Sequence, residues 1–255
     1  MKRHGLRFEI WDLLSQPGMP LRFYVAQPDR GKAKQGVLYV LDEKTWPRFM
    51  ALFGEPFVDL LTEETNLPGH KPGSASSLSL AAWRDRLLAE HGVAVFFAPR
   101  GVGLTAWNPE ERKQAQIRRR FMLLGQTLDG GRVWDIRRAI RALRSGPLPS
   151  RLPLVVQARG IMAMNALYAA VFEPGVNGLE LANLPATHKV GPDYLNVLRV
   201  LDAPHTLALA SERVKVNLFE ADAAAWEFPL AVIRKLGWAE DRLVVKAGAG
   251  PDRLP

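Results

Sequence analysis

The sequence predicts one α/β domain, residues 1–255, with a mostly parallel sheet of about eight strands flanked by helices. Short apolar runs such as residues 36–41 and 93–98 are typical of strands buried on both faces, because they lack the alternation of a half-exposed strand. Segments with helical periodicity separate many of these runs, which favours right-handed crossovers and parallel pairing. A chain of 255 residues is also long enough to bury one large core.

The N-terminal half is expected to begin with a hairpin, within residues 1–30, whose turn is marked by Pro17-Gly18. Residues 42–75 contain four prolines that interrupt any long helix. We therefore expect this stretch to pack as short helices over the carboxyl edge of the sheet, as a lid segment. The other elements predicted here are strands at 6–11, 21–26, 36–41 and 93–98, and helices at 77–90 and 109–124.

The C-terminal half is organised around a buried strand, a sharp turn and a helix in residues 152–172. A helix over 133–143 precedes it, with apolar residues on one face and arginines away from that face. Residues 247–255 are rich in Gly and Pro and are expected to form a frayed tail. The remaining predictions are strands at 179–182, 213–219 and 242–246, and helices at 193–201, 206–210 and 223–236.

The composition limits the classes of function. The chain is 47% hydrophobic and 24% charged, which is typical of a soluble globular protein. No signal peptide or membrane-spanning run is visible, so a cytoplasmic location and no membrane partner are the default expectations. The chain has no cysteine, which excludes disulfides, thiolate catalysis and cysteine metal sites. Its five histidines show no ligand spacing, so we predict no metal site, and we expect no cofactor.

The formal net charge is +8, and the excess comes largely from arginines between residues 112 and 151. A solvated helix face is the simplest interpretation of these arginines. The alternative is a basic nucleic-acid or anion-binding protein. The run Arg118-Arg119-Arg120 with Phe121 lacks the interleaved aromatic residues on which single-stranded nucleic acids stack. A nucleic-acid partner is therefore not expected.

Three stretches together carry a resemblance to a known family. They are residues 92–103, which end in Arg100-Gly-Val-Gly103, residues 121–140, and residues 194–202 with the strand and turn at 214–222. As a set they resemble α/β hydrolases of the acetyl xylan esterase type, which are relatives of prolyl-oligopeptidase-like hydrolases. The resemblance covers about residues 6–246. It implies an α/β-hydrolase fold and, for intact members, carboxylic-ester hydrolysis by a serine, an acid and a histidine in that chain order.

The resemblance also implies where the catalytic residues would lie. The nucleophile position of the Gly-x-Ser-x-Gly turn falls on Gly160, which has no side chain to attack a substrate. The acid position falls on Asp222, with Glu220 as a less favoured substitute. The family's base is a histidine after Lys246, but no histidine follows His205 in this chain. The full turn corresponds to Ala158, Arg159, Gly160, Ile161 and Met162.

The expected oxyanion turn differs from the family as well. Such enzymes usually place a His-Gly turn after the strand at 36–41, whereas this chain has Asp42-Glu43-Lys44. Two carboxylates there would oppose a developing oxyanion unless Lys44 compensates. We therefore predict a catalytically degenerate member of the family that acts as a binding or interaction module. Its expected partners are a small ester or carbohydrate-derived ligand, or a neighbouring hydrolase domain or protein.

Two further hypotheses concern individual residues. An active ester hydrolase with an unorthodox site would use His188 as its base, together with a displaced serine from the group Ser74, Ser76, Ser77 and Ser79. Loop or helix-capping roles are the favoured interpretation of these serines. Arg159, at the turn before a helix, would either contact an anionic ligand or pair with a local acid such as Asp222 or Glu43.

Overall fold

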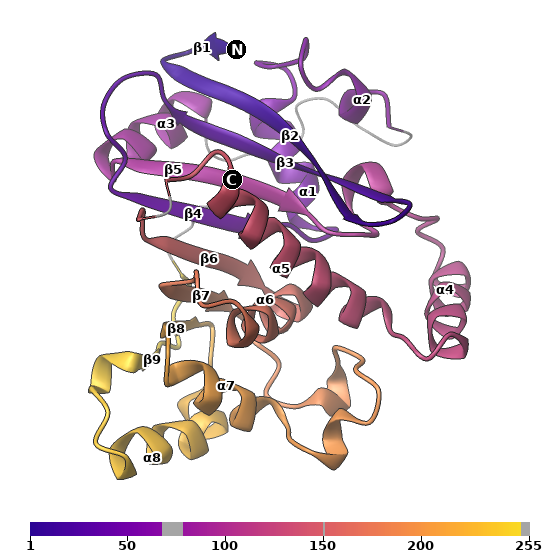
Figure 1. Ribbon diagram of the computed structural model, residues 1–255, viewed down its shortest axis with the longest axis vertical. Helices are drawn as coiled ribbons and strands as arrows, with labels where there is room; N and C mark the ends of the chain where they lie inside the picture. The colour runs from indigo at the N-terminus through magenta and orange to yellow at the C-terminus, as the bar shows by residue number, and fades with distance from the viewer. Residues whose placement is uncertain (68–78, 150, 251–255) are drawn as a thin grey trace.

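The computed structural model describes residues 1–67, 79–149 and 151–250, and within them nine strands form one sheet (Figure 1). The strands are β1 (Lys2–Arg3), β2 (Leu6–Gln16), β3 (Met19–Pro28), β4 (Gln35–Val40), β5 (Gly92–Ala98), β6 (Leu154–Arg159), β7 (Gly178–Ala182), β8 (Lys215–Phe219) and β9 (Leu243–Val245). Their order in the sheet is β1-β2-β3-β5-β4-β6-β7-β8-β9. The pairs from β5–β4 to β8–β9 are parallel, whereas β1, β2 and β3 pair antiparallel. The predicted α/β class with a mostly parallel sheet is confirmed, and the additional strand is the two-residue β1.

Helices flank this sheet. In the view of Figure 1, α5 (Leu128–Ser145) and α6 (Gly160–Phe172) cross the front of the sheet and pack against each other. α3 (Leu80–Ala89) packs against β3 and β5. The other helical segments are α1 (Thr45–Phe53), α2 (Thr62–Thr65), α4 (Glu111–Leu123), α7 (Ala203–Ser211), α8 (Glu227–Lys235) and the 3-10 turns η1 (Gly103–Thr105), η2 (His188–Val190), η3 (Val197–Arg199), η4 (Ala223–Trp226) and η5 (Glu240–Arg242).

An aromatic cluster holds the segment after β4 against the sheet. Phe53 of α1 lies 5.1 Å, between ring centroids, from both Phe96 of β5 and Trp83 of α3. Phe57, beyond α1, is fully buried and stacks on Phe8 at 4.5 Å. Contacts of this kind contribute specific ring geometry as well as buried apolar area. The described part of residues 42–75 therefore forms short helices that contribute core side chains. Residues 68–75 of the expected lid lie outside the described residues, and the lid itself stays a prediction.

A buried ion pair joins the turn after β5 to α5. The guanidinium of Arg100 donates two hydrogen bonds of 2.7 Å to the carboxylate of Asp135, and both side chains are at most 2% exposed. Ser15 of β2 donates a third hydrogen bond to Asp135. At Gly131, a Cβ atom would lie 2.7 Å from Nη1 of Arg100, so this glycine leaves the space that the guanidinium occupies. The pair fixes the Arg100-Gly-Val-Gly103 turn relative to α5.

Other arginines of α5 are paired rather than only solvated. Arg137 and Arg141 donate to the two oxygens of Glu173, which follows α6. Arg144 donates to the carbonyl oxygens of Leu152 and Gly175. Much of the arginine excess in this part of the chain thus ties α5 to the strand and helix that follow it. The expectation of a solvated face holds better for α4, where no residue is buried.

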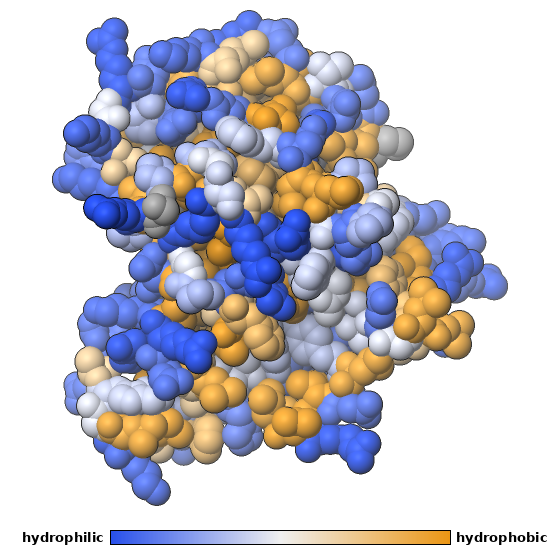
Figure 2. All heavy atoms as spheres, viewed as in Figure 1, coloured by the Kyte–Doolittle hydropathy of each residue, from blue (hydrophilic) through white to orange (hydrophobic). Residues whose placement is uncertain are grey.

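The predicted helix over residues 193–201 is wrong. Only the short turn η3 forms there, because Asn196 adopts a left-handed conformation with φ 59°, which an α-helix does not accommodate. Apolar side chains of this segment remain exposed, among them Val200 at 83%. They lie near the end of α4, whose Leu123 is 86% exposed, and Figure 2 shows apolar residues gathered on this side of the molecule. Arg118 of α4 approaches Asp193 at 3.6 Å.

Part of the C-terminal stretch, residues 246–250, is hydrogen-bonded to the rest of the protein. Gly248 accepts a hydrogen bond from the backbone of Glu220 at 3.0 Å, and Lys246 accepts one from Ala221 at 3.2 Å. Of the predicted frayed tail, residues 247–250 are therefore attached to the turn after β8, and residues 251–255 lie outside the described residues. Among the described helices, none is both long and apolar enough to cross a membrane.

Candidate functional site at the strand-to-helix turn

The turn between β6 and α6 has an unusual backbone conformation. Arg159 ends β6 in an extended conformation, and Gly160 begins α6 with φ +56°. A residue in this left-handed region at a strand-to-helix turn is typical of a sharp elbow that exposes its side chain at the carboxyl edge of the sheet. A Cβ atom built at Gly160 would meet no atom within 4 Å. The turn therefore has room for a side chain that the sequence does not supply.

An ion pair lies beside this turn. The guanidinium of Arg159 donates from Nη1 to Oε1 of Glu220 at 2.8 Å, and from Nη2 to Oε2. Glu220 follows β8 and has φ +51°, a conformation uncommon for a residue other than glycine. The two side chains are 47% and 29% exposed. Arg159 is thus paired with a local acid, although the acid is Glu220 and not Asp222 or Glu43.

Asp222 has a local structural role. Its carboxylate accepts a hydrogen bond of 3.1 Å from the backbone of Ala224 and caps the turn η4. The side chain is exposed. The segment after β9, in which the family places its histidine, reads Lys246-Ala-Gly-Ala-Gly250. Within the turn after β8 and the segment from Lys246 to Gly250, Asp222 and Glu220 are therefore the only side chains that could accept a proton as a carboxylate or imidazole base does.

The turn after β4 has its carboxylates occupied. Oδ1 of Asp42 accepts hydrogen bonds from the backbone amides of Lys44 and Thr45, at 3.0 and 2.7 Å, so it orders the start of α1. Oε1 of Glu43 accepts a 2.7 Å hydrogen bond from Nη2 of the buried Arg132. The cation that compensates Glu43 is accordingly Arg132 of α5, and not Lys44 as considered from the sequence.

His188 is buried, with 7% of its surface exposed, and its ring is fully hydrogen-bonded. Nε2 lies 2.9 Å from the hydroxyl of Tyr168, and Nδ1 lies 3.3 Å from the carbonyl oxygen of Pro192. Because a carbonyl can only accept, this contact places a ring proton on Nδ1. Thr206 in turn donates to the Tyr168 hydroxyl at 3.0 Å. The His188 ring is thus engaged by groups of the protein on both nitrogens.

These hydrogen-bonded side chains lie away from the elbow. Tyr168 is eight residues after Gly160 on α6, which corresponds to about 12 Å along the helix axis. Burial raises the pKa of Tyr168, so its phenol remains protonated. Within the described residues, the hydroxyl that is hydrogen-bonded to the His188 ring is this phenol. The structure thus does not bring a described serine to His188.

The serines considered as displaced nucleophiles divide into two groups. Ser74, Ser76 and Ser77 lie outside the described residues. Ser79 caps α3, where its Oγ accepts a hydrogen bond from the amide of Ala82 at 3.2 Å. Within the described parts of the chain, no group of three or more His, Cys, Asp or Glu side chains has metal-site geometry.

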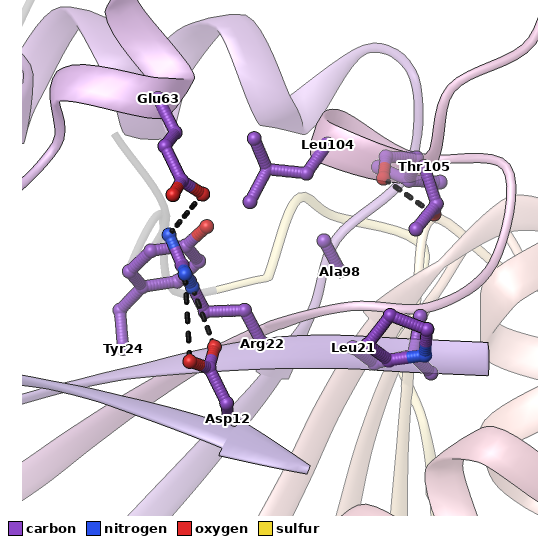
Figure 3. Close-up of a pocket in the computed structure, with 10 residues that line it drawn as sticks. Asp12, Leu21, Arg22, Tyr24, Glu63, Ala98, Leu104 and Thr105 are labelled. Atoms are coloured by element: carbon purple, nitrogen blue, oxygen red, sulfur yellow. Dashed lines mark hydrogen bonds and ion pairs between the residues drawn. The ribbon is translucent and has the colours of Figure 1, made fainter. Parts of the chain in front are cut away.

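Four cavities lie among the described residues at places away from the elbow. Their volumes run from about 260 to 500 Å³, which is the lower range for small-molecule sites. None of the four is lined by Arg159, Gly160, Glu220 or Asp222. One cavity, drawn in Figure 3, lies between the β2–β3 hairpin, α2 and the turn after β5. This cavity could not be predicted from the sequence, since its walls come from four separate segments.

Solved structures show which fold this chain shares. A proposed acetyl xylan esterase from Bacteroides fragilis matches with a TM-score of 0.70 at 15% identity, over 96% of this chain and 67% of its own. A proposed dienelactone hydrolase from Klebsiella pneumoniae subsp. pneumoniae matches with a TM-score of 0.53 at 12% identity, over 96% of this chain and 86% of its own. The chain therefore has the α/β-hydrolase fold of these esterase-like proteins, as the sequence resemblance implied.

A larger enzyme contains the same fold as one part. The acylaminoacyl peptidase of Pyrococcus horikoshii matches 97% of this chain with a TM-score of 0.57 at 11% identity, but the match covers only 37% of the peptidase. No protein-family model and no curated protein sequence matches this chain. At such identities the likeness extends to the fold and leaves function to the residues of the site.

Proposed function

We propose that this protein is a catalytically degenerate α/β-hydrolase-fold protein of the acetyl xylan esterase-like type, which acts through binding and not through ester hydrolysis. The observation that carries the proposal is Gly160. This residue has the left-handed backbone of an elbow and open space for a side chain, yet it has no atom that can attack an ester carbonyl. Loss of the nucleophile alone costs hydrolases of this mechanism many orders of magnitude in rate.

The neighbouring groups support the same conclusion. Glu220 is engaged by Arg159, and Asp222 caps a turn. Glu43, at the turn after β4, is engaged by Arg132. Glu220, Asp222 and Glu43 therefore each have a structural partner. The segment after β9, as far as residue 250, provides no histidine that Asp222 or Glu220 could orient. Without an oriented base, a serine introduced at residue 160 would also lack activation as a nucleophile.

Hydrolysis of p-nitrophenyl acetate and p-nitrophenyl butyrate by the purified protein tests the proposal. We expect no rate above buffer for the wild-type protein, and no change in the variants Asp222→Ala and His188→Ala. A rate that His188→Ala abolishes, in a variant that remains folded by circular dichroism, would establish the active-hydrolase alternative instead. A known esterase, diluted until its rate can no longer be distinguished from hydrolysis in buffer, gives the detection limit of the assay.

A further inference from the structure

The cavity shown in Figure 3 has the construction of a binding site. Its volume is about 390 Å³, and none of its lining residues comes from β6, α6 or β8. The walls are contributed by β2, β3, α2 and the stretch from Ala98 to Thr105. A small molecule of roughly ten to fifteen heavy atoms fits a space of this size.

Three carboxylates surround one guanidinium at this cavity. Arg22 donates to Asp12 at 2.7 Å and to Glu64 at 2.9 Å, and its Nη1 lies 3.1 Å from Glu63. Figure 3 shows Asp12 and Glu63 on either side of Arg22 at the cavity wall. Acidic side chains therefore outnumber the one basic side chain, three to one, at this place. A cation in the cavity is therefore favoured over a neutral molecule, and an anion is disfavoured.

The third carboxyl group, that of Glu64, lies behind the cavity wall and contacts two of the residues that line the cavity. Its side chain is completely buried, and Oε1 accepts hydrogen bonds from two cavity-lining groups, Arg22 and the hydroxyl of Tyr24. Oε2 is also buried, and no donor reaches it from the described residues. Glu64 is not among the residues that line the cavity, so it acts on a bound ligand from behind the cavity wall and not through direct contact. Burial and the neighbouring Glu64 carboxylate raise the pKa of Tyr24 well above 10, so the phenol stays neutral and does not add to the negative charge.

Apart from Thr105, the remainder of the cavity is apolar. Leu21 and Ala98 line it from the strands, and Val102 and Leu104 line it from the turn after β5. From these features together we infer that the cavity binds a small organic cation, in which an ammonium or guanidinium group faces the carboxylates and an apolar body contacts the leucine and valine side chains. The combination of few polar groups with apolar walls is typical of small-molecule sites.

Benzylamine, which is protonated at neutral pH, is the probe, and benzyl alcohol is its neutral counterpart of nearly equal shape. Ligand-observed NMR titration of the full chain measures both dissociation constants. We expect benzylamine to bind in about the millimolar range, as is usual for a ligand of this size. Benzyl alcohol should bind at least about tenfold more weakly, and added salt should weaken only the amine. Equal affinity for the two probes, or no saturable binding of the amine, would overturn the inference.

Two variants locate the binding. Glu63→Gln removes one exposed carboxylate at the cavity and should weaken benzylamine by about three- to tenfold, because one unit of charge is lost at short range. Leu104→Trp should fill the cavity and abolish binding. Glu55→Gln is the matched control, since Glu55 is exposed and does not line the cavity. If Glu63→Gln behaves like Glu55→Gln, the cation binds elsewhere and the inference is wrong, even if Leu104→Trp fails to fold.

Discussion

Arg159 and Glu220 connect the carboxyl ends of two strands that are not neighbours in the sheet. Arg159 ends β6 and Glu220 follows β8, while β7 lies between these strands. Their bidentate pairing spans the edge at which the elbow lies. The pair gives the guanidinium a permanent anionic partner within the protein, so a ligand anion would have to displace Glu220 to reach it.

Removal of Glu220 should therefore make Arg159 available. We expect Glu220→Gln to bind acetate more tightly than the wild-type protein, because the guanidinium loses its bidentate partner. The cost in the free energy of unfolding should be below about 1 kcal/mol, since both side chains are partly exposed. Acetate titration monitored by NMR measures the first effect, and urea unfolding measures the second. If acetate binds no better after the substitution, Arg159 is not an anion contact.

The left-handed conformation of Gly160 predicts a modest cost for a side chain there. Gly160→Ala should lower the free energy of unfolding by about 1–2 kcal/mol, the cost of the left-handed backbone alone. Gly101→Ala should cost more, because its φ is +82° and the new Cβ would also lie 2.9 Å from Trp107. Urea unfolding of both variants makes the comparison. Equal losses would mean that the elbow is more crowded than its backbone indicates.

The buried pair of Arg100 and Asp135 should be the most sensitive of the ion pairs discussed here. Asp135→Asn leaves a buried guanidinium without its charge partner, and such changes typically cost about 3–5 kcal/mol. Asp222→Asn is the control, because this exposed cap can be replaced by asparagine within about 0.5 kcal/mol. Chemical denaturation of both variants gives the two free energies. A loss of similar size in both would contradict the structural role of the buried pair.

Glu173 predicts a contribution to stability that depends on pH. Burial by itself raises the pKa of this carboxyl, but hydrogen bonds from Arg141 and Arg137 outweigh it, so the pKa lies below its usual value of 4.5. A group whose pKa is lowered by folding stabilises the protein above the unfolded pKa, and this stability is lost as the pH falls through the folded pKa.

The difference in stability between the wild type and Glu173→Gln should therefore be largest near neutral pH and should shrink below about pH 4.5. Urea unfolding at several pH values measures it. Glu55→Gln, which removes an exposed carboxylate, should show no such dependence. A difference that remains constant from pH 7 to pH 3 would show that Glu173 acts through packing and not through its charge.

Local sequence patterns were sufficient to predict the class of fold and most of the elements along the chain. Strands covered on both faces are almost entirely apolar, and this local pattern identified β4 and β5 without knowledge of their neighbours. The sequence also establishes that residue 160 is a glycine and that no histidine follows His205, because these are facts of covalent structure. The segment at 193–201 was mispredicted, since apolar spacing alone does not reveal the left-handed Asn196 or the exposure of its neighbours.

The partners in the ion pairs could be identified only from the folded chain. Arg159 selects Glu220 instead of Asp222, and Glu43 selects Arg132 instead of Lys44, because pairing depends on distances between segments that lie far apart in the sequence. The cavity beside Arg22 likewise exists only where a hairpin, a short helix and a turn meet. Local periodicity reports which face of an element is buried, whereas the partner of each polar group is fixed by the packing of the whole chain.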